Sequence, residues 1–325
     1  MGNNYGVMGW LALSIQSVFG TPTSSWSYLP IISEAIDSVP TQDPDTSLKG
    51  HFDPGPIFEG QRAVAGDIVF IPPPDLLGFI LKSVVGDEAT VDNGDTSYTH
   101  TFTPRTTDFA VNCALQPFTL QIHRGVATSE RITDVIFTKL VFTISGGKVS
   151  CTASVVGRAT EQISPTSPSF ADYTPWYWKD FTVTLGGAGS TIWRDLTITI
   201  DNLIDSSYTL SGTAEPGALE RSAGENQRSI AVSGNLNYDN ITEYNKFQAG
   251  TSQALVISGT SGHQVATGPV YANITFDIKD FHYTSAKVNL GGPGRMIMPI
   301  EGIGKYSSGD SKAFDVSLLN NTATY

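Results

Sequence analysis

Residues 63–70 read AVAGDIVF, and residues 231–238, which lie 168 positions further along the chain, read AVSGNLNY. Apolar side chains alternate with small or polar ones in both stretches, and that period predicts half-buried β-strands. The same offset relates ISEAIDS at 32–38 to IDNLIDS at 200–206, whereas the segments between these pairs share little. The sequence therefore predicts a module that occurs twice, with its differences concentrated in a long loop.

Each copy of the strand is followed by the signals of a short helix. Three prolines and Asp75 precede LLGFI, and proline is tolerated in the first turn of a helix. In the second copy Asp239 or Asn240 can cap the helix, and Glu243 follows. We expect Asp75 and Glu243 in the first turns, where a carboxylate interacts favourably with the helix dipole.

Composition favours strands over long helices. The chain has 325 residues, 40% of them hydrophobic, which is enough for a sizeable core and for two domains of ordinary size. Its 32 glycines and 18 prolines favour turns, and Thr, Ser, Val and Ile fill the patterned stretches. We therefore predict a mainly β fold of two tandem, similar domains, each with one short flanking α-helix.

The division between the halves is expected at a Pro/Ser-rich segment. Residues 164–169 read SPTSPS, which is typical of a linker. Each half closes on a predicted hairpin with a glycine-rich turn, at 135–156 and 274–300. We predict a first β domain over 1–160, a linker over 161–175 and a second, similar β domain over 176–325.

The net charge of −12 argues against a protein that grips nucleic acid, because such proteins need clusters of Lys and Arg against the phosphates. No apolar run approaches the length of a membrane span, and no secretory signal is recognisable at the N-terminus. The two cysteines, Cys113 and Cys151, are expected to be free thiols in a reducing compartment.

No group of residues carries the spacing of a catalytic, cofactor or metal site. The five histidines, at 51, 100, 123, 263 and 282, are scattered. Asp43, Asp45 and Asp53 lack the register of a calcium loop. GGPGR at 291–295 resembles a phosphate-binding loop but precedes a predicted strand instead of a helix, so a hairpin turn is the better interpretation. We expect no enzyme activity, no cofactor and no metal.

Trp176 and Trp178 form the most suggestive aromatic group. Such rings stack on sugars or anchor interfaces, but they can equally pack the linker onto the second half. They are candidates for interface or packing roles.

Three further stretches carry a family resemblance: GWLALSIQSVFGTP at 9–22, RAVAGDI at 62–68 followed by DLLG at 75–78, and YTHTFT at 98–103. Taken along most of the chain, the sequence resembles long-tailed bacteriophage tail tube proteins in the two-domain version of their fold. The residues after Tyr306 match least clearly.

The resemblance implies that the two tandem domains are β-sandwiches or barrels, each with a flanking α-helix, and that they assemble into a ring. It also implies a structural subunit of a viral tail, made in the host cytoplasm and located in the virion. Two tandem domains imply three chains in a pseudo-sixfold ring, and rings stack into a hollow conduit with an acidic lumen. The partners implied are further copies of the chain and the tape-measure, tail-terminator and distal-tail proteins; DNA would pass through without specific binding, and no membrane is involved.

Two long loops, 38–60 and 206–228, are expected to contact the rings above and below. The candidate inter-ring residues are Asp43, Asp45, Lys49, His51, Phe52, Asp53, Glu215, Glu220, Arg221 and Glu225. The alternative is a two-domain β-sandwich adhesin or carbohydrate-binding protein that uses Trp176 and Trp178.

Overall fold

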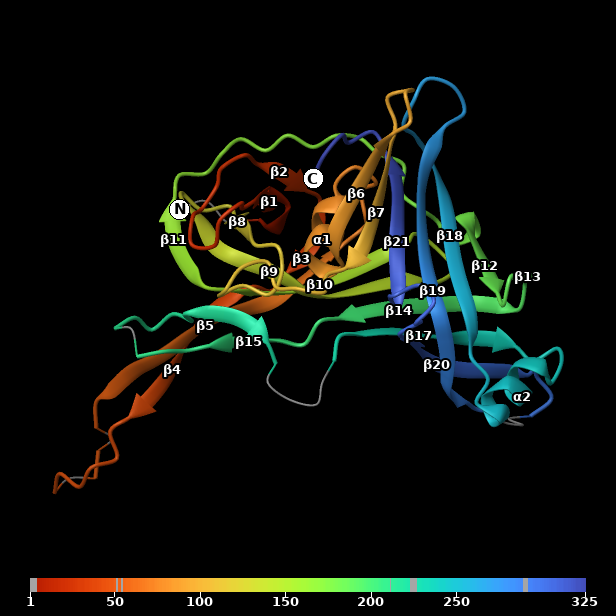
Figure 1. Cartoon of the computed structure of the whole chain (residues 1–325). Coiled ribbons are helices and arrows are strands. Elements are labelled where there is room, and N and C mark those ends of the chain that lie inside the picture. The colour runs from red at the N-terminus through yellow and green to blue at the C-terminus, as the bar shows by residue number, and fades with distance from the viewer. Residues whose placement is uncertain (1–4, 51, 54, 211, 223–226, 289–291) are drawn as a thin grey trace.

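Antiparallel strands make up most of the structure, as the composition predicts (Figure 1). The computed structural model describes residues 5–50, 52–53, 55–210, 212–222, 227–288 and 292–325. The expectation of a barrel is wrong, because the strands of the described segments form large open sheets and no closed barrel. Among these segments, no helix is both long enough and apolar enough to cross a membrane.

The first half of the main sheet is built around β5 (Ile57–Phe70). β3 (Ile31–Glu34) and β4 (Asp37–Pro44) pair with one edge of β5, and β10 (Ser150–Gly157) pairs with the other. The next strand across the sheet is β9 (Ser129–Ile144), which pairs with β10 and is joined to it by the predicted glycine hairpin. The order across the sheet is β3/β4, β5, β10, β9.

The second half repeats this order of pairings. β14 (Trp193–Asp201) pairs with β17 (Ser229–Asn237), β17 with β20 (Ile297–Lys305), and β20 with β19 (Tyr271–Ala286). The predicted strands at 63–70 and 231–238 are therefore β5 and β17, each the second strand of its half. The match of 32–38 to 200–206 is wrong in register, because Ile36 lies beside Gly66 whereas Leu196, and not Ile204, lies beside Gly234.

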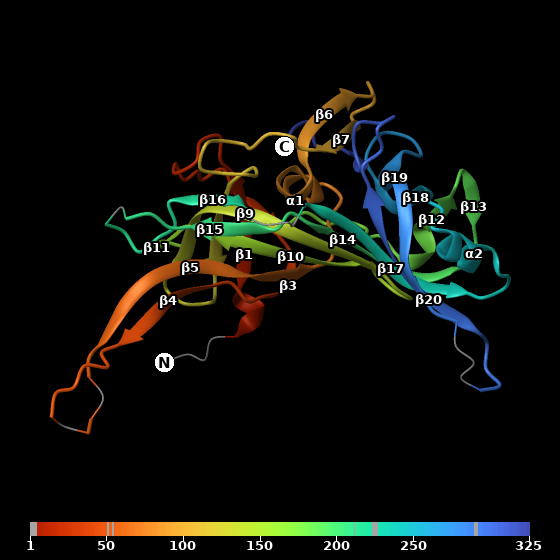
Figure 2. The same cartoon turned by 60° about the horizontal axis from the view of Figure 1, so that its bottom comes forward.

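The two halves join through β9 and β14. These strands pair in antiparallel register from Leu196 opposite Ile144 to Asp201 opposite Lys139. One sheet consequently runs from β4 to β19, and Figure 2 shows it as a bowed band with α1 (Leu77–Val84) on one side.

The helices confirm the predicted positions but differ in their packing. α1 buries Leu77, Ile80, Leu81 and Val84 in the core. Asp75 lies two residues before α1, so its expected place in the first turn is wrong. α2 (Thr242–Ala249) has Glu243 in its first turn.

α2 begins after Asn240, whose Oδ1 accepts a hydrogen bond from the Thr242 amide at 2.9 Å. Ile241 occupies the N-cap position itself. Asn240 therefore accepts a hydrogen bond from the start of the helix, but it does so from the position one residue before the N-cap.

The remaining strands either lie on the core side of the main sheet or extend its hydrogen-bonded network of strands. β7 of the first half pairs with β21 of the second, with Phe102 opposite Val316. Phe142 and Phe276 bring the halves together inside the core, with ring centroids 5.1 Å apart. These strands are β1 (Trp10–Ile15), β2 (Ser27–Leu29), β6 (Gly86–Asp92), β7 (Tyr98–Pro104), β8 (Phe118–His123), β11 (Ala159–Ile163), β12 (Phe181–Leu185), β13 (Ala188–Ser190), β18 (Gln253–Gln264) and β21 (Phe314–Asn320).

Two segments differ from the sequence expectation. The expected loop at 38–60 contains all but the first residue of β4 and the start of β5, which have no buried face there and hence no apolar period. The expected linker at 161–175 begins inside β11 and then lies against the first half, where Tyr28 Oη donates to Thr166 Oγ1 at 3.0 Å and Tyr173 Oη donates to the Ile71 carbonyl at 3.1 Å. The division into two domains stays a prediction.

Candidate assembly surfaces

A long hairpin projects from the body of the molecule, and we call residues 37–62 the arm (Figures 1 and 2). β4 and β5 remain paired along it, as far as Pro44 opposite Ile57. Its base is held by the Arg62 amide, which donates to the Ala214 carbonyl at 2.8 Å, and by Tyr208 Oη, which donates to the Arg62 carbonyl at 3.2 Å. The paired part of the arm, up to Pro44 and Ile57, is therefore an ordered projection and not a loose loop.

The arm carries apolar side chains that nothing covers. Leu48 and Phe52 at the tip are fully exposed, at 102% and 109%, and Ile57 and Phe58 are more than half exposed. Exposed apolar groups on a projection mark an interaction site. Five predicted inter-ring residues lie together on the arm: Asp43, Asp45, Lys49, Phe52 and Asp53.

His51 lies outside the described residues. Within the tip, hydrogen bonds from Lys49 and Ser47 lower the pKa of Asp45. The Asp45 carboxylate is thus held inside the tip and keeps its negative charge.

The second predicted loop forms a smaller hairpin at the base of the arm. β15 (Ile204–Ser207) pairs with β16 (Ala218–Arg221), and Arg221 Nε donates to Asp108 Oδ1 at 3.0 Å. Glu215 is half-buried and Glu220 is exposed, whereas Glu225 lies outside the described residues. Inter-ring contact by this hairpin stays a prediction.

The two candidate tryptophans have different environments. Trp176 is fully buried, and its Nε1 donates to the Gly259 carbonyl at 3.1 Å. Trp178 is 44% exposed, and its Nε1 donates to the Arg194 carbonyl at 2.6 Å. Trp176 therefore packs, and only Trp178 is available at the surface.

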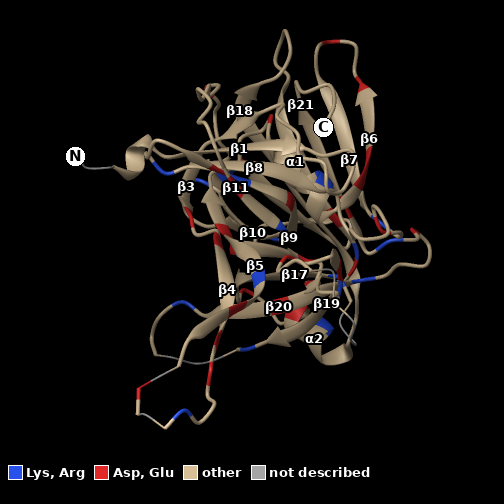
Figure 3. Ribbon diagram, turned by 90° about the vertical axis from the view of Figure 1, so that its left-hand side faces the viewer, with Lys and Arg blue, Asp and Glu red and all other residues tan. Residues whose placement is uncertain are grey.

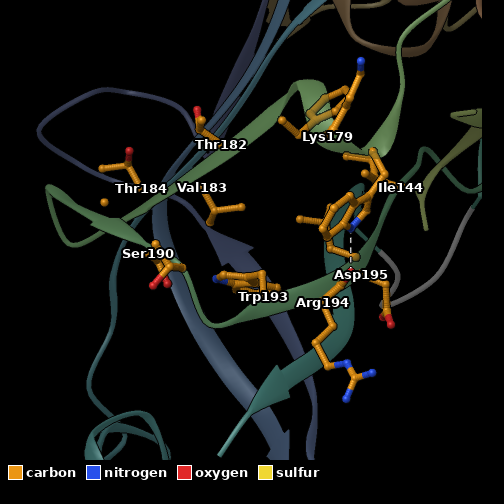
Figure 4. Close-up of a pocket in the computed structure, with 14 residues that line it drawn as sticks. Ile144, Lys179, Thr182, Val183, Thr184, Ser190, Trp193, Arg194 and Asp195 are labelled. Carbon is orange, nitrogen blue, oxygen red and sulfur yellow. Dashed lines mark hydrogen bonds between the residues drawn. The ribbon is translucent and has the colours of Figure 1, made fainter. Parts of the chain in front are cut away.

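Trp178 lines a cavity of about 490 Å³, which we call the tryptophan cavity (Figure 4). Trp193, Phe181, Val183 and Ile144 supply most of its apolar wall. Sequence reasoning missed it, because its walls come from β9, β12 and β14. The available signal was a second tryptophan, Trp193, just beyond a short hairpin.

Charged side chains flank the tryptophan cavity. Lys179 and Arg194 lie on either side of it, with their charged ends directed away from its centre (Figure 4). Neither forms an ion pair within the described part of the chain. Asp195 also lines the cavity, but its carboxylate accepts hydrogen bonds from Asn235. The charge left free at the rim is positive.

The main sheet has an open edge at each end. Within the described residues, no strand pairs with the edge of β4 that faces away from β5. At the other end, the part of β19 after Phe281 pairs with β20 on one side, and no described strand pairs with its other side. Unpaired edges are sites at which a further strand adds.

The face of the main sheet opposite the core is polar. Along β14 and β10, buried apolar residues alternate strictly with partly exposed ones. Four acidic residues lie on this face, and Lys139 pairs with one of them, Asp201, at 3.4 Å. Its polar and charged members include Asp67, Lys139, Thr143, Thr152, Ser154, Asp195, Thr197, Thr199, Asp201, Ser233, Asn235, Ser285, Lys287 and Glu301.

A family model described as phage tail tube protein matches residues 9–304 of the chain. The chain belongs to the phage tail tube protein family. This tail tube protein is accordingly a structural component of a phage tail. A comparison with curated proteins gave no match.

One polar cluster lies inside the tail tube protein and not on a surface. His100 is fully buried, with Nδ1 2.8 Å from Glu88 Oε1, and Lys82 Nζ lies 3.0 Å from Glu88 Oε2. Burial alone raises the pKa of Glu88, but hydrogen bonds from His100, Lys82 and Thr90 lower it to about 2. The cluster joins α1 to β6 and β7, which is a structural role.

Both cysteines of the tail tube protein are buried free thiols, as predicted. Burial raises the pKa of each thiol, to about 12 for Cys113. A raised pKa leaves little thiolate for chemistry at neutral pH. In the described segments, no three His, Cys, Asp or Glu residues gather in a way that could hold a metal ion.

Proposed function

We propose that three copies of the tail tube protein form a pseudo-sixfold ring, and that rings stack into the conduit through which the genome passes. One observation carries the proposal: β9 of the first half pairs with β14 of the second. Within the chain, the strand at the far edge of the first half, β9, thus pairs with the strand at the near edge of the second half, β14. The first half of another chain can add to the free edge of the second half in the same way.

Two similarities between the halves, which an internal duplication would explain, support this proposal. If the four main-sheet strands of each half are numbered along the chain, both halves place them across the sheet in the order first, second, fourth, third. Along the chain, the helix of each half lies between the second strand and the closing hairpin. Gly66 and Gly234 occupy the same place in the two halves: a Cβ would lie 2.1 Å from the Ala35 carbonyl oxygen at the first and 2.4 Å from the Asp195 carbonyl oxygen at the second. A shared close approach is what two copies of one module predict.

The ring would close through the two open edges. β4 of one chain would take the place beside β19 of the next chain that β14 takes beside β9 within the chain. Such a head-to-tail contact makes a ring when its rotation closes, and closure removes the exposed edges. With two modules a chain, six positions need three chains.

The polar face of the main sheet is the proposed wall of the lumen. Four acids, Asp67, Asp195, Asp201 and Glu301, lie on it beside Lys139 and Lys287, and the whole chain carries −12. DNA binds proteins mainly through cations placed against its phosphates, so an acidic wall lets DNA pass without adhering. Figure 3 shows that acidic residues also lie along the arm.

The arm and the β15–β16 hairpin are the proposed contacts between rings. The tape-measure, tail-terminator and distal-tail proteins are proposed partners from the family resemblance. A catalytic activity is not part of the proposal. A glycan-binding role through both tryptophans is not favoured, because Trp176 is fully buried.

The test replaces residues 45–56 by an Asn-Gly turn, which closes the hairpin at the pair Pro44 and Ile57. Electron microscopy and sedimentation of the purified protein should show rings that no longer stack, whereas the unmodified chain gives tubes. Normal tubes from the shortened chain would contradict the role of the arm. A persistent monomer from the unmodified chain would contradict the ring.

A further inference from the structure

We propose that the tryptophan cavity is the receptor for the arm tip of a second copy in the adjacent ring. This inference rests on the proposed stacking and adds to it a defined occupant and a defined socket. The occupant is the apolar pair Leu48 and Phe52 at the arm tip, and the socket is the wall formed by Trp178, Phe181 and Trp193.

The first argument is position. The arm leaves the body at one end of the molecule, and β12, β13 and the start of β14 lie at the opposite end in both views (Figures 1 and 2). A projection at one end and a cavity at the other form a head-to-tail contact that repeats from copy to copy, which is the kind that builds a filament.

The second argument is apolar complementarity. Leu48 and Phe52 are fully exposed on the isolated chain, and the cavity presents aromatic and aliphatic walls. A volume of about 490 Å³ lies within the range of about 300–1,000 Å³ that is typical of pockets for compact ligands. Docking would remove both exposed apolar surfaces from water together.

The third argument is charge. Within the described residues, Asp43 and Asp53 on the arm have no basic partner, and Lys179 and Arg194 at the cavity have no acidic one. Asp45, by contrast, is already held by Lys49. An acidic projection thus meets a basic rim, which favours this orientation of stacking over the reverse.

Photo-crosslinking tests the contact directly. Phe52 is replaced by benzoylphenylalanine in the full chain, tubes are formed and irradiated, and cross-linked peptides are identified by mass spectrometry. We expect cross-links from position 52 to residues 178–196 of another copy. Tubes whose cross-links fall elsewhere, or that give none, would overturn the inference while leaving the tube itself intact; failure of the unmodified chain to form tubes would instead contradict the proposed function.

Charge reversal provides a second, independent test. The pair Lys179→Glu and Arg194→Glu should raise the concentration needed for tube growth about tenfold or more, with rings unaffected. Adding Asp43→Lys and Asp53→Lys should restore growth, because the two charges are exchanged. Lack of any rescue, with rings still formed, would contradict the pairing.

A matched pair of apolar variants separates docking from a general loss of apolar surface. Phe52→Ser should raise the critical concentration about tenfold, since it removes a burial that forms only on docking. Val111→Ser is the control, because Val111 is 96% exposed but lies outside the arm. Equal effects of the two variants would contradict a specific socket.

Discussion

Gly66 and Gly234 show how single residues fix the main sheet. A Cβ at Gly66 would meet backbone of Ala35 and Ile36, between β3 and β4, and a Cβ at Gly234 would meet backbone of β14; backbone cannot move aside as a side chain can. Gly66→Ala and Gly234→Ala should therefore each lower the free energy of unfolding by about 1–3 kcal/mol, measured by urea titration. Gly189→Ala is the control, because a Cβ there meets nothing within 4 Å; equal stability of all three variants would refute the packing argument.

Glu88 should make stability depend on pH in a defined window. Its pKa in the folded chain, about 2, lies below the ordinary value of 4.5. The stabilisation is thus fully present above pH 4.5 and is lost as the pH falls towards 2, and it amounts to at most about 3 kcal/mol. Glu88→Gln should flatten the fall in unfolding free energy across that window in the arm-shortened chain, which does not stack.

The control for this prediction is Glu59→Gln. The Glu59 side chain is 68% exposed and is paired only with Arg62, so it should contribute little. If Glu88→Gln kept the pH dependence of the parent, the buried pair with His100 would have no energetic role.

At this scale the sequence identified residues but not their neighbours. The repeat marks Gly66 and Gly234, yet their contacts with Ala35 and Asp195 depend on how the first strand pairs, and the constant offset misplaces that strand. Trp178 was a candidate from its residue type. The sequence did not indicate Trp193 as a site residue, because it lines the tryptophan cavity only when the fold brings β12 and β14 together.

Among the elements, the two helices differ in what they contribute. α1 places Ile80 in the core at 0% exposure, whereas the only fully or nearly buried residue of α2 is Glu243. Ile80→Ala should cost about 2–5 kcal/mol of unfolding free energy. Asn245→Ala in α2, an exposed position, should change it little, and comparable losses from both would contradict this division.

The elements that sequence predicts well are those with one buried face. α1 and the two closing hairpins were predicted because apolar residues recur with a helical or strand period. The arm was missed as a pair of strands, because β4 alternates only between exposed and partly exposed side chains. The two strands of the arm pair because they continue the pairing of the sheet from Asp37 opposite Ala65. The side chains of the arm itself do not indicate this pairing.

For the whole molecule, the charge of the polar face makes a further prediction. Replacing Asp67, Asp201 and Glu301 by Lys should leave tubes intact but make them retain double-stranded DNA, because cations on the wall bind phosphates. Retention measured by co-sedimentation should weaken as salt rises. The control reverses three exposed acids away from this face and from the proposed inter-ring contacts, Asp92, Glu161 and Asp172. Equal retention by both variants would contradict the assignment of the lumen.

The central claim is that the pairing of β9 with β14 is the template for the contact between chains. Cryo-electron microscopy of tubes from the purified tail tube protein tests it most directly. The account predicts three chains in each ring, six similar modules, and β4 of one chain beside β19 of the next. Rings of six chains, or rings joined through any other edge, would contradict it.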